Sequence, residues 1–444
     1  MSAILAIVII VIIIGAAASG AYYFYVFNAK AGPSVSTTLG SASSGLSSTT
    51  ISQPGSSSSS TGTSQTLSSS SSSSSKSQAP IGYVKYTFDL CTQALEPGIV
   101  PGYNGGSGCF LEPEGVMYDN ANGKIYVSSA NITAINGASN SFGSNIGGVF
   151  TPEQMAYDPV NNYIYVSNYE PSTDANLNQI SSVGVVNAAT GQSVENITVA
   201  NGGQNQIQQW GIAFDPSNGY VYVASYRNYG TSGNISVIDT STNTVIKTIT
   251  GFANCPEQVV CSPSAVFYDP ADGYIYVGHL GDVANVTLVQ GTSVVKSISS
   301  NSTNYVGGGS QWAFAYDNKS GVIYAADGQG TISVIGATNN TLIENIGSMH
   351  FNINTGQITY TGGEYNGSSP EGLAYDAANN YLYVANFDSN NVTVINCATN
   401  TIIGTIAVGS SPRGIAYDPV NGYIYVANHF SDTVSIISTA PNGT

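Results

Sequence analysis

Short apolar runs separated by turn-forming residues recur along the chain from Ile81 onward. One unit consists of a run that ends in an aromatic residue and Asp (Pro412 to Asp418), a Tyr-Ile-Tyr-Val run (Tyr423 to Asn428), and a third run (Val434 to Ile437). Runs of this length, rich in Val, Ile, Thr and Tyr and bounded by Gly, Pro, Asn and Asp, are typical of β-strands joined by tight turns. We therefore expect an all-β protein.

This unit occurs seven times, at a spacing of about 40 to 60 residues. In several copies a fourth run follows, such as NTVIKTITG or NTIIGTIAVG. Repetition of one small antiparallel sheet at this period predicts a seven-bladed β-propeller. The other six copies begin with PEGVMYD at Pro113, PEQMAYD at Pro152, QWGIAFD at Gln209, PSAVFYD at Pro263, QWAFAYD at Gln311 and PEGLAYD at Pro370.

The seventh copy has only three runs. A separate β-rich run, Gly82 to Leu90, precedes the first copy. We expect it to pair beside Thr433 to Ile437 as the outer strand of the last blade, since this would close the ring and leave no blade incomplete.

The second run of the repeat resembles a known family motif. YVAN at Tyr383 and Tyr425, and YVSN at Tyr165, are similar to the YVTN-type β-propeller repeat. The resemblance covers nearly everything after residue 80 and implies the propeller fold. It implies less about function, because that family includes surface proteins, binding modules and relatives of lactonase-like enzymes.

The N-terminal segment carries a targeting signal. The run from Ala3 to Phe27 is uncharged and apolar, and its length matches the about 20 residues of a membrane-spanning helix. We expect residues 1–28 to form a transmembrane signal-anchor. A cleaved signal peptide is the alternative, since GAAASGA offers small residues for cleavage although no basic segment precedes the run. Either form exports the remainder.

Residues 29–80 are dominated by Ser, Thr and Gly. This composition buries too little apolar surface to fold and predicts a disordered linker, which is also compatible with an O-glycosylated stalk. The propeller domain then spans residues 81–444. We expect a single-pass protein of the cell membrane whose propeller faces the extracellular side.

Charge narrows the range of partners. Charged residues make up 8 % of the chain, and the formal net charge is −16. This balance argues against binding nucleic acid through its phosphates. The low charge, many glycosylation acceptors and Ser/Thr-rich linker resemble archaeal cell-surface proteins. Expected partners are cell-surface proteins or glycans, and the membrane itself through the N-terminal segment.

The predicted topology gives the propeller two unlike faces. Connections from the second to the third strand, and from the fourth to the next first strand, are long and individual; their side is called the loop face. The opposite side, the turn face, has short and nearly uniform turns such as DPVNG and DPSNG. Variable loops on a rigid scaffold carry function, so we expect a ligand on the loop face.

One position of the repeat collects unusual residues, immediately before the Gly, Ala or Gln near the start of each first strand. Because first strands line the central channel, these residues should form a ring at its mouth on the loop face, with Arg413 between Glu371 and Glu114. The ring contains both tryptophans of the chain. Its members are Glu114, Glu153, Trp210, Ser264, Trp312, Glu371 and Arg413.

The ring has two interpretations. Trp faces stack on sugars and cations, and carboxylates accept hydrogen bonds from hydroxyl or ammonium groups, so the mouth could hold a sugar, a cation or a peptide side chain. Alternatively, the Glu–Arg–Glu cluster neutralises its own charges and the Trp residues fill the channel. The sequence leaves both open.

The sequence offers little support for a catalytic site. His279 and His429 follow second strands and His350 lies in a long connection, but no HExxH-like metal spacing and no GxSxG motif is present. We predict no cofactor and no catalytic residues. An enzyme is thus less favoured than a binding module, although a metal among Glu114, Glu153, Glu371 and His429 would indicate one.

Cysteines and sequons fit an exported chain. Cys91 with Cys109, and Cys255 with Cys261, could each close a local disulfide loop outside the cell, and Cys397 is left over as a free thiol or an intermolecular link. Four Asn-X-Ser/Thr acceptors precede a third strand at the expected outer rim, and we expect several to be glycosylated. These acceptors are Asn131, Asn234, Asn285 and Asn391.

Two functions follow from these observations. The favoured one is a membrane-anchored extracellular propeller that binds protein or glycan ligands, adheres, or supports the cell envelope through its loop face. The alternative is an extracytoplasmic metal-dependent hydrolase or lyase whose site lies at the channel mouth.

Overall fold

The chain divides into two compact units, Met1–Ser74 and Ser75–Thr444, each considered by itself. The structure, a computed structural model, describes residues 11–15, 22–26, 81–97, 111–169, 172–173, 179–203, 207–227, 233–252, 262–280, 285–299, 311–328, 330–347, 349–352, 357–360, 362, 365, 367 and 369–439.

The first unit contains one described element, an antiparallel pair of β1 (Val11–Gly15) and β2 (Tyr22–Val26). Its Val, Ile and Tyr residues favour strands in water, whereas a bilayer would favour a helix that satisfies its own backbone. The rest of the predicted anchor and the linker to residue 80 lie outside the described residues. Among the described residues, no helix is both long and apolar enough to cross a membrane.

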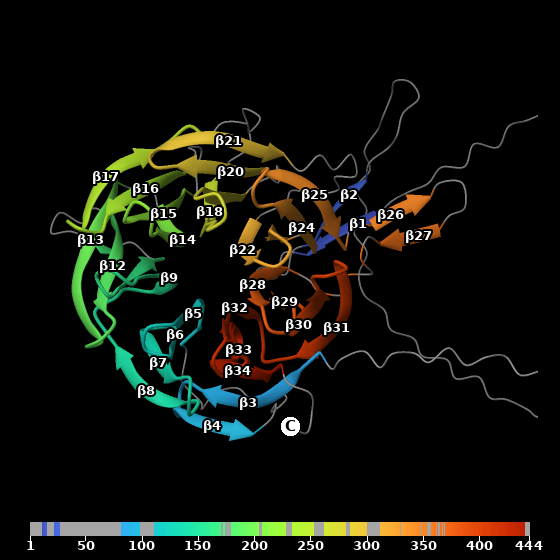
Figure 1. Cartoon of the computed structure of the whole chain (residues 1–444), viewed down its shortest axis with the longest axis horizontal. Helices are drawn as coiled ribbons and strands as arrows, with labels where there is room; N and C mark the ends of the chain where they lie inside the picture. Colours follow the sequence, from blue (N-terminus) through green and yellow to red (C-terminus); the bar gives the residue numbers. More distant parts are fainter. Residues whose placement is uncertain are drawn as a thin grey trace, which may run out of the picture. The chain divides into compact units, whose positions relative to one another are not determined.

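Seven antiparallel sheets surround a central channel in the second unit (Figure 1). This confirms the predicted seven-bladed propeller. In each blade the first strand lies nearest the channel and later strands lie progressively outward.

Blades one to four are built in sequence order, and blade two gains a short extra strand, β11 (Ser172–Thr173). Blade one is β5 (Val116–Asp119), β6 (Lys124–Ser128), β7 (Ile132–Asn136) and β8 (Ser141–Ile146). Blade two is β9 (Pro152–Asp158), β10 (Tyr163–Asn168), β12 (Gln179–Asn187) and β13 (Gln192–Gly203). Blade three is β14 (Ile207–Asp215), β15 (Tyr220–Arg227), β16 (Asn234–Asp239) and β17 (Thr244–Ile249). Blade four is β18 (Ser262–Tyr268), β19 (Ile275–Leu280), β20 (Asn285–Gln290) and β21 (Ser293–Ser299).

Blades five to seven complete the ring, and a hairpin of β26 (Met349–Asn352) and β27 (Gln357–Tyr360) follows blade five. Blade five is β22 (Gln311–Asp317), β23 (Val322–Asp327), β24 (Thr331–Gly336) and β25 (Thr341–Ile346). Blade six is β28 (Pro370–Asp376), β29 (Tyr381–Asn386), β30 (Asn391–Asn396) and β31 (Thr401–Ala407). Blade seven is β32 (Pro412–Asp418), β33 (Tyr423–Asn428), β34 (Thr433–Ser438), β3 (Tyr83–Asp89) and β4 (Ala94–Pro97), with the short helix η1 (His429–Ser431) between β33 and β34.

The closing strand is where the sequence predicted it. β3 pairs antiparallel with β34, from Tyr83 opposite Ser438 to Asp89 opposite Thr433. Phe88 in β3 is fully buried in the core of blades seven and one. The sequence did not predict β4, which pairs with the outer edge of β3.

Every turn between a first and a second strand has the same local design. A buried Asp ends the first strand or, in blade four, directly follows it, and its Oδ1 accepts a 2.8 Å hydrogen bond from the backbone N–H two residues later. The fourth residue after the Asp has a positive φ, which favours Gly and Asn. The repeated Asp-x-x-x-Gly/Asn pattern therefore encodes this turn. The seven aspartates are Asp119, Asp158, Asp215, Asp269, Asp317, Asp376 and Asp418.

The second-strand tyrosine of each repeat joins neighbouring blades. Each is fully buried, and its hydroxyl donates a hydrogen bond to the next blade. In six blades the acceptor lies in the turn between the third and fourth strands, as for Tyr165 and the Oδ1 of Asn243 at 2.6 Å. In blade six the acceptor is the carbonyl of Ile81, because the outer strand of blade seven begins there. The other donors are Tyr126, Tyr222, Tyr276, Tyr324 and Tyr425.

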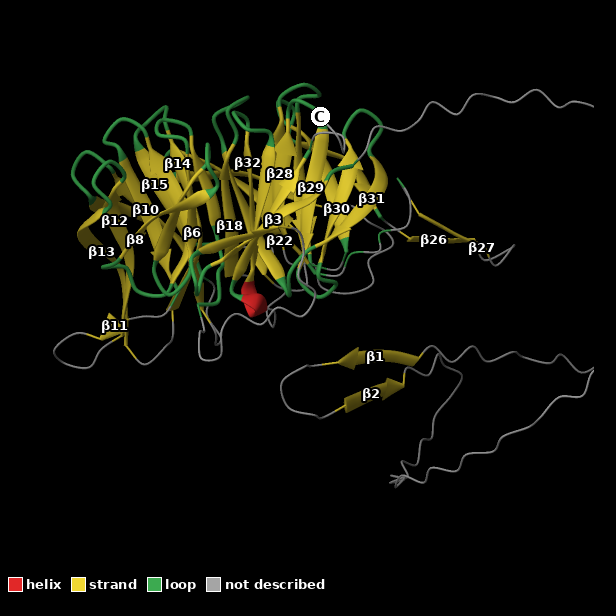
Figure 2. Ribbon diagram, turned by 90° about the horizontal axis from the view of Figure 1, so that it is seen from below, coloured by secondary structure: helices red, strands yellow, loops and turns green. Residues whose placement is uncertain are grey.

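The two faces differ as expected. The loop face carries η1 and β11 and lies on the lower side of the propeller in Figure 2. Ile81 and Ser438 lie at the opposite end of the blade-seven strands, because β3 begins opposite the end of β34. The described chain thus enters and leaves the propeller on the turn face.

Candidate functional site

The predicted ring exists. Its seven residues lie within the first four residues of the first strands or, for Glu114, just before the strand, and together they line one pocket of about 140 Å³ at the channel mouth. Three further residues complete the lining, namely Gln154, Tyr169 and Gly211. Arg413 lies between Glu114 and Glu371, as the blade order predicted.

Local backbone geometry explains how these side chains come to face the channel. In blades two to seven the pairing of first and second strand shifts register at the ring position. Such bulges redirect a side chain. In every blade except blade two, where Gln154 follows, the next residue is Gly or Ala. It allows close approach of the neighbouring blade, because a Cβ on Gly372 would lie 2.1 Å from the Arg413 carbonyl oxygen.

Strained backbone accompanies all four charged ring positions. Two residues before each of them, a non-glycine residue has a positive φ, a conformation that costs roughly 1–2 kcal/mol. The angles are 44° at Glu112, 41° at Thr151, 52° at Ser369 and 54° at Ser411. Strain of this kind gathers at functional sites.

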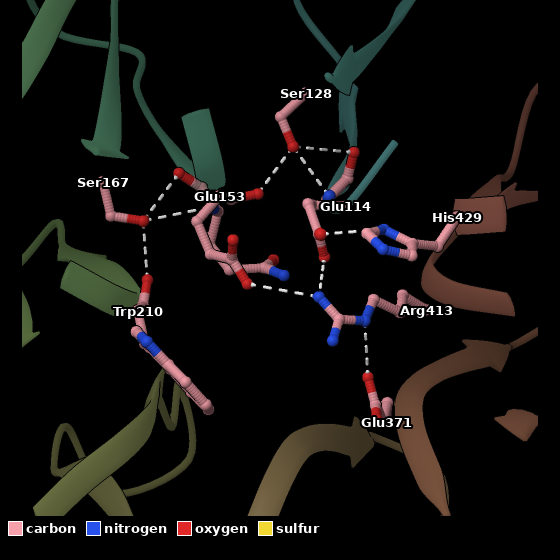
Figure 3. Close-up of polar contacts among 10 residues, drawn as sticks. Glu114, Ser128, Glu153, Ser167, Trp210, Glu371, Arg413 and His429 are labelled. Atoms are coloured by element: carbon pink, nitrogen blue, oxygen red, sulfur yellow. Dashed lines mark hydrogen bonds and ion pairs between the residues drawn. The ribbon is translucent and has the colours of Figure 1, made fainter. Parts of the chain in front are cut away.

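Arg413 is shared unequally by three carboxylates (Figure 3). Its Nη1 donates to Glu114 Oε2, and its Nε lies 2.9 Å from Glu371 Oε2 in an ion pair without hydrogen-bond alignment. The third contact, from Nη1 to Glu153 Oε1, is 3.9 Å. The side chain of Arg413 is also only 27 % exposed.

The cluster holds more negative than positive groups, and this excess contributes to the shifted pKa values of its members. Burial raises the pKa of Glu371 to about 7, and Glu114 and Asp388 add to the rise while Arg413 opposes it. Burial, followed by the charge of Glu114, raises the pKa of Glu153 well above its usual value. The three carboxylates outweigh the desolvation of Arg413, so the pKa of Arg413 is raised.

The two tryptophans form the opposite wall of the pocket. Their rings stack with centroids 4.8 Å apart and an interplanar angle of 21°. Trp210 comes from blade three and Trp312 from blade five, and they meet because the blade between them carries the small Ser264 at the ring position. Trp210 also contacts Tyr226 (5.5 Å) and Tyr169 (6.2 Å).

A second tier of residues surrounds the ring, and sequence reasoning missed it. Tyr169, Phe387 and His429 each follow the Asn that ends a second strand, and Tyr226 is their counterpart in blade three. The Phe387 ring lies 4.9 Å from the Arg413 guanidinium carbon, and His429 Nδ1 lies 2.9 Å from Glu114 Oε1. The sequence contained a signal for this tier, because each of its residues lies four positions after a bridging tyrosine.

A larger pocket of about 390 Å³ adjoins the mouth between blades seven, one and two. The two pockets share Glu114, Glu153, Tyr169 and Arg413. A ligand that places one group in the mouth therefore has space in the adjoining pocket for the rest of the molecule.

His279 lies apart from the ring. His279 is buried, its Nε2 lies 2.9 Å from Thr287 Oγ1, and burial lowers its pKa to about 4. His350 lies in β26. Within the described ranges, no group of three His, Cys, Asp or Glu residues is placed to hold a metal ion.

Cysteines and acceptor asparagines are only partly described. Cys91 is disulfide-bonded, while Cys109, Cys255 and Cys261 lie outside the described residues. Cys397 is a buried free thiol.

Of the acceptors, Asn131 is exposed and Asn391 half-buried. Asn234, expected at an exposed rim, is instead only 8 % exposed, because it begins strand β16, which lies between β15 and β17 and is buried along nearly its whole length. Nothing is described of the Asn285 side chain, although its backbone begins β20.

Comparison with known proteins supports the fold. No protein-family model matches the chain, and no curated protein matches it. Among solved structures, hydrazine synthase from Kuenenia stuttgartiensis is similar with a TM-score of 0.56 and 17 % identity, over 77 % of this chain and 100 % of that chain. The chain is a seven-bladed β-propeller. At this identity the similarity extends to fold alone, and the YVTN resemblance stays a prediction.

Proposed function

We propose that this propeller is a non-catalytic binding module that holds protein or glycan ligands at the channel mouth of its loop face. One observation carries the proposal: all seven ring residues line a single pocket, with a stacked Trp pair facing an Arg–carboxylate cluster. Binding sites characteristically combine apolar or aromatic walls with a few convergent polar groups.

We further propose that the module is exported, anchored in the membrane by residues 1–28, carried on the linker 29–80 and glycosylated. The disulfide at Cys91 supports export, because disulfides persist in oxidising compartments. The chain enters the propeller on the turn face, which leaves the loop face free for a ligand at the cell surface.

The proposal is tested by screening the full-length chain against immobilised neutral, acidic and amino-sugar oligosaccharides and against cationic and anionic peptides. Wild type should bind one class, and Trp312→Ala should bind it about tenfold more weakly or worse, because a buried aromatic contact is lost. Ile343→Ala, at a 56 % exposed position on β25, is the control. Binding of no class, or equal binding by Trp312→Ala at an unchanged thermal midpoint, would contradict the proposal.

A further inference from the structure

We propose that the group held at the mouth is an alkylammonium, seated between the Glu153 carboxylate and the Trp210–Trp312 pair. The inference rests on the proposed function and names the chemistry of its ligand.

The channel mouth holds more carboxylates than cations. Arg413 is engaged closely by Glu114 and Glu371, whereas Glu153 stands 3.9 Å from it. These two carboxylates already exceed the charge of the single guanidinium, so Glu153 adds a further negative group without a close cation. Arg413 is the only Lys or Arg among the residues lining the two pockets. An added cation would therefore reduce the excess of negative charge, and an anion would increase it.

The Glu153 carboxylate is accessible to a ligand. Glu153 keeps 13 % of its side-chain surface exposed, and it lines both pockets. Burial and the charge of Glu114 raise the pKa of Glu153, so this carboxyl keeps a proton to higher pH than usual and a bound cation would compete with that proton. The other titratable groups of the two pockets are Glu112, Glu114, Glu371, Tyr169, His429 and Arg413.

The aromatic wall of the mouth offers a second contact for a cation. Trp210 is the next ring residue after Glu153, and it stacks on Trp312. Trp is the best aromatic partner for a cation, which is attracted to the ring face within about 6 Å. A carboxylate beside stacked indoles thus offers an ammonium both a charge partner and a π face. A neutral sugar would use the indoles but leave the surplus carboxylate unpaired.

Size selects the form of the ligand. The mouth of about 140 Å³ suits a small terminal group, and the adjoining pocket of about 390 Å³ accommodates what carries it. A lysine-type side chain on a protein segment fits this shape best, because its stem is narrow and its ammonium terminal. An amino sugar is the other source of the same group and is distinguished by the experiment.

The test is calorimetric titration of the full-length chain at pH 7.5 with cadaverine, N-acetyl-lysine methylamide and glucosamine. The uncharged controls are Nε-acetylated N-acetyl-lysine methylamide and glucose. We expect the lysine compound to bind at least tenfold more tightly than its Nε-acetylated form. Tighter binding of glucosamine than of the lysine compound would overturn the lysine-type assignment and retain the ammonium.

Variants locate the site. Glu153→Gln should weaken binding of the lysine compound about tenfold or more. Glu344→Gln on β25 is the matched control, since its amide oxygen can still accept from Asn400 Nδ2, and it should bind as wild type. Because the bound cation replaces a proton on Glu153, affinity should fall about tenfold per pH unit below the pKa of that carboxyl, and Glu153→Gln should lose this dependence.

Each contrary result has a distinct meaning. Equal affinity for charged and acetylated compounds, or unchanged binding by Glu153→Gln with a native thermal midpoint, overturns the ammonium inference. If amines fail but a neutral glycan binds and is lost in Trp312→Ala, the proposed function stands and this inference falls. If no compound or screened ligand binds, both fall.

Discussion

The hydroxyl of Tyr383 in blade six donates a 3.2 Å hydrogen bond to the backbone carbonyl of Ile81, which lies 302 positions earlier in the chain. Six equivalent tyrosines bridge neighbouring blades in the same way. Only for Tyr383 does the acceptor lie in the segment that leads into the closing strand β3. This contact ties the seventh blade into the ring at its outer edge.

Removing that hydroxyl tests the bridge. We expect Tyr383→Phe to lower the free energy of unfolding by about 1 kcal/mol, because one intramolecular hydrogen bond to a backbone acceptor is lost. Denaturant titration measures the change. The control is Tyr163→Phe, whose hydroxyl has no hydrogen bond to any residue that the structure describes. Equal effects of the two substitutions would show that the bridge contributes nothing.

The closing strand is a second target. Deleting residues 82–90 removes the buried Phe88 and exposes the edge of β34, so the thermal midpoint should fall sharply. The milder Phe88→Ala should lower the free energy of unfolding by about 3 to 5 kcal/mol. Val160→Ala, at an 81 % exposed position, serves as control. A neutral deletion would disprove closure by β3.

Stability should depend on pH through Glu371. Its pKa rises from an ordinary 4.5 to about 7 on folding, so the folded state binds this proton more tightly. Its stabilising contribution is complete below about pH 4.5 and is lost as the pH rises through 7, by at most roughly 3 kcal/mol.

The Glu371→Gln variant isolates this effect, since the amide does not titrate. The free energy of unfolding of wild type relative to the variant should decline between pH 4.5 and 7.5. Denaturant titrations at several pH values measure it, with Glu344→Gln as the matched control. A constant difference across this range would show that Glu371 keeps an ordinary pKa.

Close approach of the inner strands gives a steric prediction. A Cβ at Gly372 would lie 2.1 Å from the Arg413 carbonyl oxygen, so Gly372→Ala must shift one blade against the other. We expect a loss of about 1 to 3 kcal/mol in unfolding free energy. Gly147→Ala, with its nearest atom 3.8 Å away, should be tolerated. Equal stability of both variants would refute the packing described at the ring.

Much of the fold was predictable because the repeat exposes it. Seven copies fix seven blades, and the three-run seventh copy requires an outside strand, which β3 supplies. Ring membership followed as well, since equivalent positions in a propeller lie around one axis. The extra strands β4, β11, β26 and β27 were not predicted, because they lie in connections that no other copy shares.

Finer features of the site needed the structure. The Trp210–Trp312 stack depends on side chains reaching across Ser264, and sequence order alone places these tryptophans two blades apart. The unequal sharing of Arg413 depends on distances within a Glu ring that the sequence shows as equivalent. The bridging role of the repeat tyrosines was missed because their hydroxyl partners lie in other blades.

Tryptophan fluorescence reports directly on binding at the mouth, because the chain has only 2 Trp and both line the mouth. The full-length chain is titrated at pH 7.5 with N-acetyl-lysine methylamide. We expect a saturable change in emission with wild type, an affinity at least tenfold lower with Glu153→Gln, and no change with the Nε-acetylated compound. Emission that stays unchanged throughout the titration would contradict it.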